Sequence, residues 1–546
     1  ILLQDNDLKD VLGMDLDANN IEQVATATQD SSSFSINLIR SLAGQDTGRV
    51  NPVPSTAIED ADDETEGLML MGDLNDDGFD DFVVSTPEAD LVSMTDNGRV
   101  AVYYGSSSGL SELPDMIYAG ASDGAQFGFG MDLGDFNNDG VLDLAVGSPG
   151  WAPADDPTTR HGMVHVYLGN ASGVSASPWS NLTGVANESL GSAVAALHHA
   201  NSGDGLAATA RNHTVQVSPT QVDDGKVNLY TGNQSGLHPM RNLTQTENGG
   251  LFGRSLEACD VNNDGFDELI VGNTGTYDAP ATYSSVEYFF GSTSGYNGTA
   301  DHTVASITQG RLFGLNIACV GDLNGDGFDE HIVSEPFNST QSFGAGTLWL
   351  FEGTDGALPG DADWQYFPPP NSRIGEAMAG AGDINEDGYG DVYISSRMGN
   401  AAGRIEIFLG SPSGISTDRQ LLAEGNTSER LGFRMAADGD VDGDGLSDLF
   451  YSMRSGERGA SYGLTYLMLS EQDWESISFE RQGTITDVKL GTAGRGETSI
   501  VYTHADALRL HVSKLEHMND GTPGGQWVDQ TVVRLNTTHL GVAFAV

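Results

Sequence analysis

The stretch Asp322-Leu323-Asn324-Gly325-Asp326-Gly327-Phe328-Asp329-Glu330 decides the fold of this 546-residue chain. Oxygen-bearing side chains stand at positions 1, 3, 5 and 9 of the stretch, and a glycine stands at position 6. A short loop wraps a hard cation with this spacing, because alternate side chains point inward and the glycine takes a sharp turn. Position 7 offers its carbonyl and position 9 a carboxylate. Oxygen ligands without His or Cys favour calcium over zinc or copper.

The loop occurs six times in one register, beginning at residues 73, 135, 260, 322, 383 and 440, and an apolar run follows each copy. One copy alone could be an ordinary turn rich in Asp, Asn and Gly. Six aligned copies predict about six bound Ca²⁺ ions, held by positions 1, 3, 5, 7 and 9. The predicted ligands are Asp73, Asn75, Asp77, Phe79, Asp81; Asp135, Asn137, Asp139, Val141, Asp143; Asp260, Asn262, Asp264, Phe266, Glu268; Asp322, Asn324, Asp326, Phe328, Glu330; Asp383, Asn385, Asp387, Tyr389, Asp391; and Asp440, Asp442, Asp444, Leu446, Asp448.

The loops recur about every 60 residues, except that the interval between 135 and 260 is twice as long. A repeat that has lost its loop is therefore expected near residue 198. There the segment from His199 to Gly205 keeps only Asp204 of the loop pattern, so we predict no calcium. The adjacent His198 and His199 would point to opposite sides of a strand, which predicts a poor metal site.

Each repeat also contains an apolar strand after the loop, such as 143–147, and an alternating strand further on, such as 99–105. Four short strands per repeat, without helical periodicity, are typical of a propeller blade. Blades bury their faces by stacking into a ring. We predict an all-β fold, a seven-bladed β-propeller of four-stranded blades over residues 67–481, with eight blades as the alternative.

The two flanks of the repeat region differ from it. Residues 1–66 predict an N-terminal segment with a helical stretch at 8–21, a strand at 33–38 that could close the ring, and a linker at 51–66. Residues 482–546 contain strand-like runs at 498–502, 508–512 and 527–533 without a metal loop. They predict either a degenerate extra blade or the start of a second repeat domain. The first residue is Ile1 rather than Met, which predicts a processed or trimmed terminus.

The composition is extremely acidic, with 78 acidic against 24 basic residues and a net charge of −54. Such a surface repels nucleic acid and anionic membranes, and no apolar run approaches the ~20 residues of a membrane span. The basic residues are 4 lysines and 20 arginines. An acid-rich, lysine-poor composition resembles that of proteins from salt-loving microbes, and an exoprotein from ordinary seawater is the alternative. The 38% of hydrophobic residues argues against disorder.

The two cysteines, Cys259 and Cys319, stand just ahead of two neighbouring loops. They are either bridged between adjacent inner strands or two buried free thiols. Ten Asn-X-Ser/Thr sequences mildly support secretion and predict a glycoprotein. The glycosylation candidates are Asn181, Asn187, Asn242, Asn338 and Asn536.

A second motif accompanies the loops. Phe127-Gly128, Phe252-Gly253 and Phe313-Gly314 precede their loops, with variants at Ile374-Gly375 and Leu431-Gly432, and Ser-Pro or a similar pair follows several loops. The combination resembles the FG-GAP repeat of the integrin α-subunit head, a seven-bladed calcium-binding propeller. The first repeat lacks the Phe-Gly pair and the third lacks the metal loop. The resemblance covers about residues 67–481 and implies an extracellular binding or adhesion module without enzymatic activity.

The resemblance also implies that a protein or glycan partner binds the face opposite the metal loops. The variable loops 151–161 and 274–284 reach that face, and exposed aromatic side chains in loops can anchor a partner. The candidate partner-binding residues are Trp151, Arg160, His161, Tyr277 and Tyr283. Alternatively, Trp151 covers only its own blade.

Two other function classes stay open at this point. The acidity and the unfinished C-terminus allow a self-assembling structural subunit of a surface layer, filament or virion. A carbohydrate-active enzyme is the third class, because some lyases and lipases carry similar repeats, although the sequence shows no Ser/Cys–His signature or phosphate-binding loop. The expected location is extracellular or on the surface of a halophilic or marine microbe or its virus.

Overall fold

The chain forms two compact units, Val53–Met468 and a second one made of Ile1–Pro52 with Leu469–Val546. The computed structural model describes residues 11–15, 22–29, 33–40, 67–90, 94–106, 110, 114–199, 203–211, 214–217, 220–223, 225–244, 251–274, 284–306, 311–355, 362–384, 387–397, 402–416, 419–425, 430–440, 447–455, 462–468, 475–482, 485–492, 498–504, 509–517 and 525–534. Every regular element within these residues is a strand. None of them contains a helix long and apolar enough to cross a membrane.

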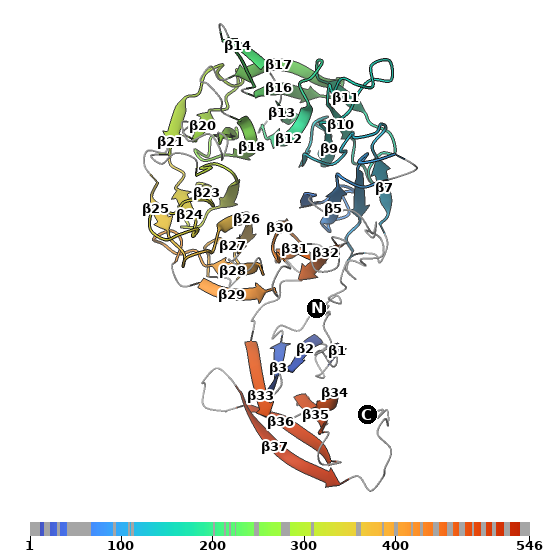
Figure 1. Cartoon of the computed structure of the whole chain (residues 1–546), viewed down its shortest axis with the longest axis vertical. Coiled ribbons are helices and arrows are strands. Elements are labelled where there is room, and N and C mark those ends of the chain that lie inside the picture. Colours follow the sequence, from blue (N-terminus) through green and yellow to red (C-terminus); the bar gives the residue numbers. More distant parts are fainter. Residues whose placement is uncertain are drawn as a thin grey trace. The chain divides into compact units, whose positions relative to one another are not determined.

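The larger unit is a ring of antiparallel sheets, seen face-on in Figure 1. Six sheets have four strands, which follow one another from the centre of the ring outward. The first three are β4 (Met69–Gly72), β5 (Asp81–Thr86), β6 (Arg99–Tyr103) and β7 (Met116–Ala119); β8 (Met131–Gly134), β9 (Asp143–Ser148), β10 (Met163–Tyr167) and β11 (Ser180–Thr183); and β12 (Leu190–Leu197), β13 (Gly205–Ala210), β16 (Lys226–Asn233) and β17 (Gly236–Thr244). The next three are β18 (Phe252–Cys259), β19 (Glu268–Asn273), β20 (Ser285–Phe289) and β21 (His302–Ala305); β22 (Ile317–Gly321), β23 (Glu330–Glu335), β24 (Thr347–Phe351) and β25 (Trp364–Tyr366); and β26 (Ile374–Gly382), β27 (Asp391–Ser396), β28 (Arg404–Phe408) and β29 (Arg419–Glu424).

The last repeat of the ring forms a sheet of three strands among the described residues, β30 (Met435–Gly439), β31 (Asp448–Ser455) and β32 (Tyr462–Met468). The prediction of seven four-stranded blades is therefore wrong, because six blades have four strands. The inner strand β30 packs against β26 on one side and against β4 of the first blade on the other, which closes the ring.

The closure is tight at the boundary between the first and last repeats. The rings of Phe82 on β5 and Phe450 on β31 stack with their centroids 3.6 Å apart, and both side chains are fully buried. The backbone N–H of Asp80 donates to the carbonyl of Asp440 at 2.9 Å, and the Asp440 N–H donates to an Asp80 carboxylate oxygen at 2.6 Å. Chain segments 360 residues apart are thus joined by packing and hydrogen bonds.

The Phe-Gly pairs and their variants pack a blade closely against the blade before it. The ring of Phe127 is almost fully buried, and Gly128 has a φ of +92°. A Cβ on Gly128 would lie 2.6 Å from the Cβ of Ser85 in the preceding blade, so a larger residue would push the two blades apart. A Cβ on Gly375 would likewise lie 2.6 Å from the Cβ of Ser334. The glycine is therefore required both by its backbone conformation and by the close approach of the neighbouring blade.

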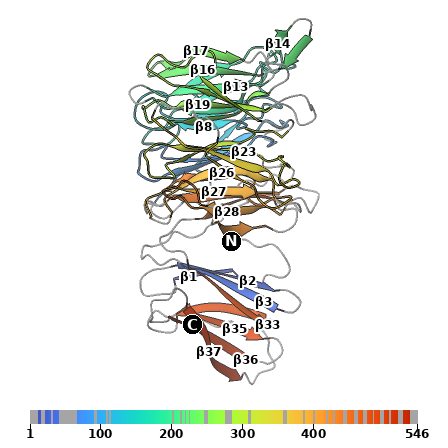
Figure 2. The same cartoon turned by 90° about the vertical axis from the view of Figure 1, so that its left-hand side faces the viewer.

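One blade carries an insertion. The hairpin β14 (Thr214–Val217) and β15 (Thr220–Asp223) lies between β13 and β16. It projects from the ring and stands out clearly in the side view of Figure 2.

The smaller unit contains two four-stranded sheets. One pairs β1 (Val11–Asp15), β2 (Glu22–Gln29), β3 (Ser33–Arg40) and β33 (Glu475–Gln482), and the other pairs β34 (Ile485–Thr492), β35 (Thr498–His504), β36 (Arg509–His517) and β37 (Gly525–Arg534). The strands expected near 498, 508 and 527 are confirmed, and the eight-blade alternative is wrong because their sheet belongs to this unit rather than to the ring.

Three expectations about the flanks need correction. The stretch 8–21, expected to be helical, contains β1. The expected closing strand is β3, which pairs with β2 and β33 and with no blade. The ring contains residues only to Met468 rather than to 481, because β33 pairs with β3. That register sets Ile36 opposite Phe479 and Leu38 opposite Ile477, so the apolar positions of the two strands match.

Candidate metal sites and the opposite face

Each metal-loop sequence connects the innermost strand of a blade to the second strand. Loops of neighbouring blades hydrogen-bond to one another: the Asn263 amide donates to the Gly327 carbonyl at 2.8 Å, and the Gly390 N–H donates to the Asp322 carbonyl at 2.9 Å. The loops therefore lie on one face of the ring, which we call the loop face. Because strands alternate in direction, the other end of every inner strand lies on the opposite face.

The five loops with described backbone at position 6 share one hydrogen-bond pattern. The position-1 carboxylate accepts from the N–H groups of positions 5 and 6, at 3.1 and 2.8 Å for Asp322. The position-5 carboxylate accepts from the position-7 N–H, at 3.1 Å from Asp326 to Phe328. The glycine at position 6 has a φ between +84° and +92° in these loops, which is why glycine recurs there.

The position-9 carboxylate is fully buried beneath each loop, in Asp81, Asp143, Glu268, Glu330 and Asp391, and also in Asp448 of the sixth repeat. In Glu330 one oxygen accepts from the Leu323 N–H at 2.7 Å and the other from the Gly353 N–H at 3.2 Å. The Asn324 side-chain amide also donates to Glu330, at 3.5 Å, so uncharged amide donors meet a carboxylate that has been taken out of water.

This burial changes the acidity of the position-9 groups. Burial is the largest cause and raises the pKa, and the negative charges of the loop aspartates raise it further, whereas backbone N–H donors oppose the change. The pKa rises to about 7 for Asp81 and Glu330, to about 8 for Asp143 and Glu268, and to about 6 for Asp391. Ionising these buried carboxylates is therefore unfavourable unless a positive charge lies close to them.

The loops also hold oxygen atoms that lack a hydrogen-bond partner. Among the described residues, the Oδ1 atoms of Asn75, Asn137 and Asn262 are buried without a donor, and so is Oε2 of Glu268. All four occupy predicted ligand positions, 3 or 9. A buried oxygen without a donor costs about 1–3 kcal/mol unless something binds it. A hard cation would satisfy these atoms and the excess charge together, so the donor set fits calcium.

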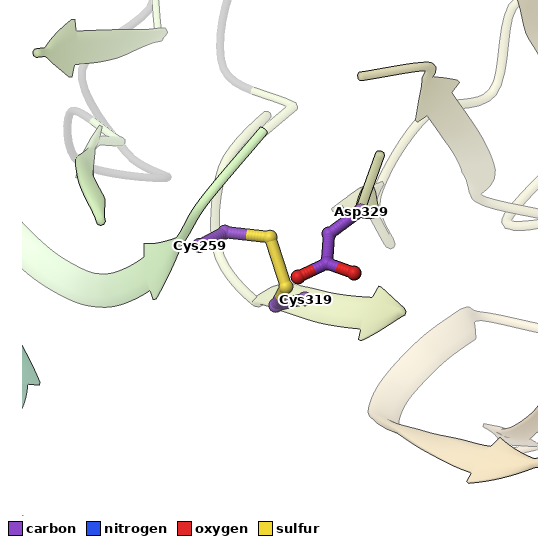
Figure 3. Close-up of side chains that lie close together, drawn as sticks. All are labelled: Cys259, Cys319 and Asp329. Atoms are coloured by element: carbon purple, nitrogen blue, oxygen red, sulfur yellow. A yellow bond between two sulfur atoms is a disulfide. The ribbon is translucent and has the colours of Figure 1, made fainter. Parts of the chain in front are cut away.

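At one place among the described residues, the ligand atoms of three His, Cys, Asp or Glu side chains lie within 4.8 Å of one another. The three side chains are Cys259, Cys319 and Asp329 (Figure 3). The two sulfurs form a disulfide between β18 and β22, with a Cα–Cα distance of 5.6 Å, so they are not available as metal ligands. The bridged alternative for the cysteines is therefore confirmed. Within the described parts of the acidic loops, no three carboxylates come as close together as 4.8 Å.

Several predicted ligands lie outside the described residues, namely Asn385, Asp442, Asp444 and Leu446. Tyr277, Tyr283 and Asn536 also lie outside them. Of the glycosylation candidates, Asn181, Asn187 and Asn242 are exposed. The prediction that Asn338 is a glycosylation site is corrected. Its side chain is buried and its amide donates to Glu335 at 2.7 Å, so no glycosyltransferase could reach this side chain in the folded chain.

The third repeat shows what replaces a metal loop. Asp204 accepts from the Asp135 N–H of the neighbouring loop at 2.8 Å, and the Nδ1 atom of His198 lies 2.8 Å from the same Asp204 oxygen. The hydrogen bond to Asp204, together with the charges of Asp204, Asp267 and Asp132, raises the pKa of His198 to about 9. A histidine cation thus stands where the other repeats have a loop for a metal cation, a role that the residue pattern alone did not indicate.

This pair predicts a pH-dependent stability. Because the pKa of His198 is higher in the folded chain than the ordinary 6.5, the stabilisation is complete below pH 6.5 and is lost as the pH rises through about 9. The imidazole is 59% exposed, so solvent screening limits the effect to about 1 kcal/mol. Melting curves between pH 6 and 10 should show a smaller decline in the variant His198→Ala than in the natural chain.

The matched control is His238→Ala, which removes a histidine that contacts Ser235 rather than a carboxylate. It should keep the decline of the natural chain. Equal declines in the natural chain and His198→Ala would show that the pair contributes nothing.

On the opposite face, the loop 151–161 folds back on itself. The carbonyl of Trp151 accepts from the N–H groups of His161 and Gly162 at 3.0 Å each, and the two aromatic rings meet edge to face with centroids 6.4 Å apart. Trp151 is half-buried and Arg160 is exposed. The structure thus brings Trp151 and His161 together at the base of the loop and leaves Arg160 in solvent.

Comparison with known proteins identifies a repeat family and two kinds of relative that match parts of this chain. The FG-GAP repeat model matches residues 69–103, 127–167, 252–286 and 315–351. Integrin alpha-3 from Cricetulus griseus is 26% identical over 189 residues, which are 33% of this chain and 17% of that protein. Phosphatidylinositol-glycan-specific phospholipase D from Mus musculus is 38% identical over 117 residues, which are 20% of this chain and 14% of that protein. The chain thus spans less than a fifth of the length of either relative.

Among solved structures, an apocarotenoid oxygenase mutant from Synechocystis aligns with 73% of this chain and with 95% of its own length. The sequence identity is 11% and the TM-score is 0.29, so this likeness supports no argument. The matched segments lie in the first, second, fourth and fifth blades. With its FG-GAP repeats in four places, its integrin α relatives and its ring of four-stranded blades, the larger unit is an FG-GAP β-propeller of the integrin-α-like type.

Proposed function

We propose that this chain is an extracellular binding or adhesion module whose propeller is held together by about six Ca²⁺ ions. The observation that carries the calcium proposal is the set of buried, unpartnered oxygens at positions 3 and 9 of aligned loops. When bound, the ion supplies the positive charge that these oxygens and the buried position-9 carboxylates require.

The chain's own residues would divide the work in each loop. The backbone N–H groups of positions 5 and 6 orient the position-1 carboxylate, and the apolar residue at position 2, such as fully buried Leu74 or Leu323, anchors the loop to the core. The ion would then fix the loop between the first two strands of a blade. A stiff loop face leaves the loops of the opposite face to vary, and variable loops on a rigid scaffold are common binding sites.

The proposed extracellular location has a further support. The Cys259–Cys319 disulfide links the inner strands of two blades, and disulfides persist mainly in oxidising compartments. The proposal assigns partner binding rather than catalysis to the chain. The structural-subunit and carbohydrate-active-enzyme alternatives stay predictions, because none of the contacts described above favours them.

A binding experiment tests the module. The full chain is immobilised and probed with a panel of purified extracellular glycoproteins and polysaccharides, in calcium and after chelation. Binding should require calcium and should fall about tenfold or more in the variant Trp151→Ala/Arg160→Ala. The control variant Arg241→Ala, on the outer strand β17, should bind normally. Binding that survives chelation and both substitutions would contradict the proposal, and turnover of a polysaccharide would favour the enzyme alternative.

A further inference from the structure

The basic residues of the ring are distributed unequally between its two faces. In each blade the first strand begins, the second ends and the third begins on the opposite face, and most of the ring's arginines and lysines stand at these points. They are Arg99, Arg160, Arg211, Lys226, Arg254, Arg311, Arg373, Arg397, Arg404, Arg430, Arg434 and Arg454. The exceptions among the described residues are Arg241 and Arg419. A chain with a net charge of −54 thus gathers its scarce positive charge on the face that lacks the acidic loops.

Four of these arginines act electrostatically on one carboxylate, and we call Arg373, Arg397, Arg430, Arg434 and Glu376 the arginine cluster. Arg373 directly precedes β26 and Arg397 directly follows β27, while Arg430 and Arg434 precede the neighbouring inner strand β30. Since β26 and β30 pack side by side, the cluster bridges two blades.

The charges in the cluster do not balance. Burial raises the pKa of Glu376, and all four arginines act to lower it. Burial also lowers the pKa of Arg397; Glu376 opposes this change, while repulsion from Arg430 and Arg373 adds to it. Arg373 and Arg430 therefore repel Arg397 beside a single carboxylate, and a second anion would relieve this repulsion.

One member of the cluster, Arg434, lines the centre of the ring. A cavity of about 1180 Å³ is lined by the inner strands, and Arg434, Arg254 and Arg211 are among its lining residues. Burial and the nearby charge of Arg211 both lower the pKa of Arg254. The cavity would admit an extended segment and is too small for a folded domain, which occupies more than ten times that volume.

Two contacts decide the chemistry of the ligand. The guanidinium of Arg373 lies over the ring of Phe337 at 5.2 Å, and that of Arg434 lies over Phe433 at 4.7 Å. These stacked guanidiniums are held in place as planar forks, which match carboxylates. The same stacking covers a face of each of these rings, and a sugar ring would need such a face to pack on. The contacts therefore favour a peptide carboxylate over an acidic polysaccharide.

We propose that the arginine cluster binds the Asp or Glu side chains of an acidic peptide segment inserted from a partner protein. This rests on the proposed function, since it names the ligand chemistry of the partner-binding face. Glu376 already occupies one place among the guanidiniums, and the carboxylates of the peptide take the others.

The test uses the full chain in calcium and a fluorescent hexaglutamate peptide, with the hexaglutamine peptide as the uncharged control. The dissociation constant from fluorescence anisotropy should rise about tenfold in Arg430→Gln, because a charge-assisted bidentate contact is lost. Arg241→Gln removes the same charge outside the cluster and should change it less than twofold. Conversely, Glu376→Gln should tighten binding, whereas Asp156→Asn, an equal change of charge on loop 151–161, should not.

Three results would overturn the inference. The first is equal weakening of binding by Arg430→Gln and Arg241→Gln, which would mean diffuse attraction only. The second is no binding of hexaglutamate at about 0.15 M salt. The third is stronger competition by polygalacturonate than by the peptide, which would mean a glycan site. Melting curves of each variant exclude unfolding as the cause. If the peptide fails while Trp151→Ala/Arg160→Ala still weakens partner binding about tenfold or more, this inference alone is wrong and the proposed function stands.

Discussion

Removal of calcium should lower the melting temperature of the full chain by more than about 10 °C. A site occupied at about 100 times its dissociation constant adds about 2.7 kcal/mol to stability, and six sites add their contributions. At about 2 cal/mol/K of unfolding entropy per residue, a ring of this size shifts by roughly 1 °C per kcal/mol. Calorimetric melting curves with calcium and with a chelator measure the shift.

The stoichiometry is the sharper readout. Isothermal titration should find about six ions in the natural chain and one fewer in Glu268→Gln, because the variant keeps the shape of the side chain and loses the charge of an oxygen that has no donor. Asp204→Asn is the matched control, since it changes the corresponding repeat without a metal loop and should leave the number unchanged. Without calcium, Glu268→Gln should be at least as stable as the natural chain, because Asp264 and Asp260 repel the buried carboxylate. An unchanged ion count in Glu268→Gln would contradict the assignment of that loop.

The substitution Phe450→Ala should destabilise the ring by about 3–5 kcal/mol, as expected for truncating a fully buried phenylalanine. Its ring stacks on Phe82 across the boundary where the first and last repeats meet. Urea unfolding measures the loss of stability. Because the boundary has no covalent link nearby, the variant should also open locally at this point, with faster amide exchange in β4 and β30.

Phe408→Ala separates the two effects. Phe408 is equally buried but packs on Trp364 and Tyr366, away from the closure. Phe408→Ala should lower the free energy of unfolding by a similar amount. Amide exchange in β4 and β30 should then be no faster than global unfolding requires. Equal amide exchange rates in the two variants would mean that the boundary between the first and last repeats is not a site of local opening.

The sequence predicted those features that repeat. The acidic loops stand where the register put them, with buried carboxylates at position 9 and left-handed glycines at position 6, because loop geometry depends on residues only a few positions apart. The Phe-Gly pairs were visible for the same reason. Their structural role, to let Gly128 approach Ser85 of the blade before it, appears only once blades are stacked.

Features that depend on distant partners were missed. The propeller was predicted to extend to residue 481, which assigned β33 to the ring instead of to β3. The alternation of a strand says which side chains share a face and not which strand will pair. The histidine that faces Asp204 was also missed, because ordinary His spacing in a degenerate loop carries no sign of a carboxylate six residues away.

The arginine cluster did leave a trace in the sequence. Arg373 and Arg430 each stand directly before an apolar-Gly pair, as Arg311 stands before Leu312-Phe313-Gly314. Aligned repeats would have shown this recurrence. The meeting of Arg397 with both of them follows from the packing of adjacent blades and needed the fold.

The unequal charge of the two faces makes the ring an electric dipole, and salt decides over what range that dipole acts. In dilute buffer the Debye length is tens of ångströms, and a negatively charged partner would be turned toward the arginines before contact. In brine at about 1 M salt it shrinks to roughly 3 Å, which is the length of a single hydrogen bond. There the field guides nothing, association slows to the rate of unguided collisions, and the guanidinium groups select a partner only after it has touched the ring.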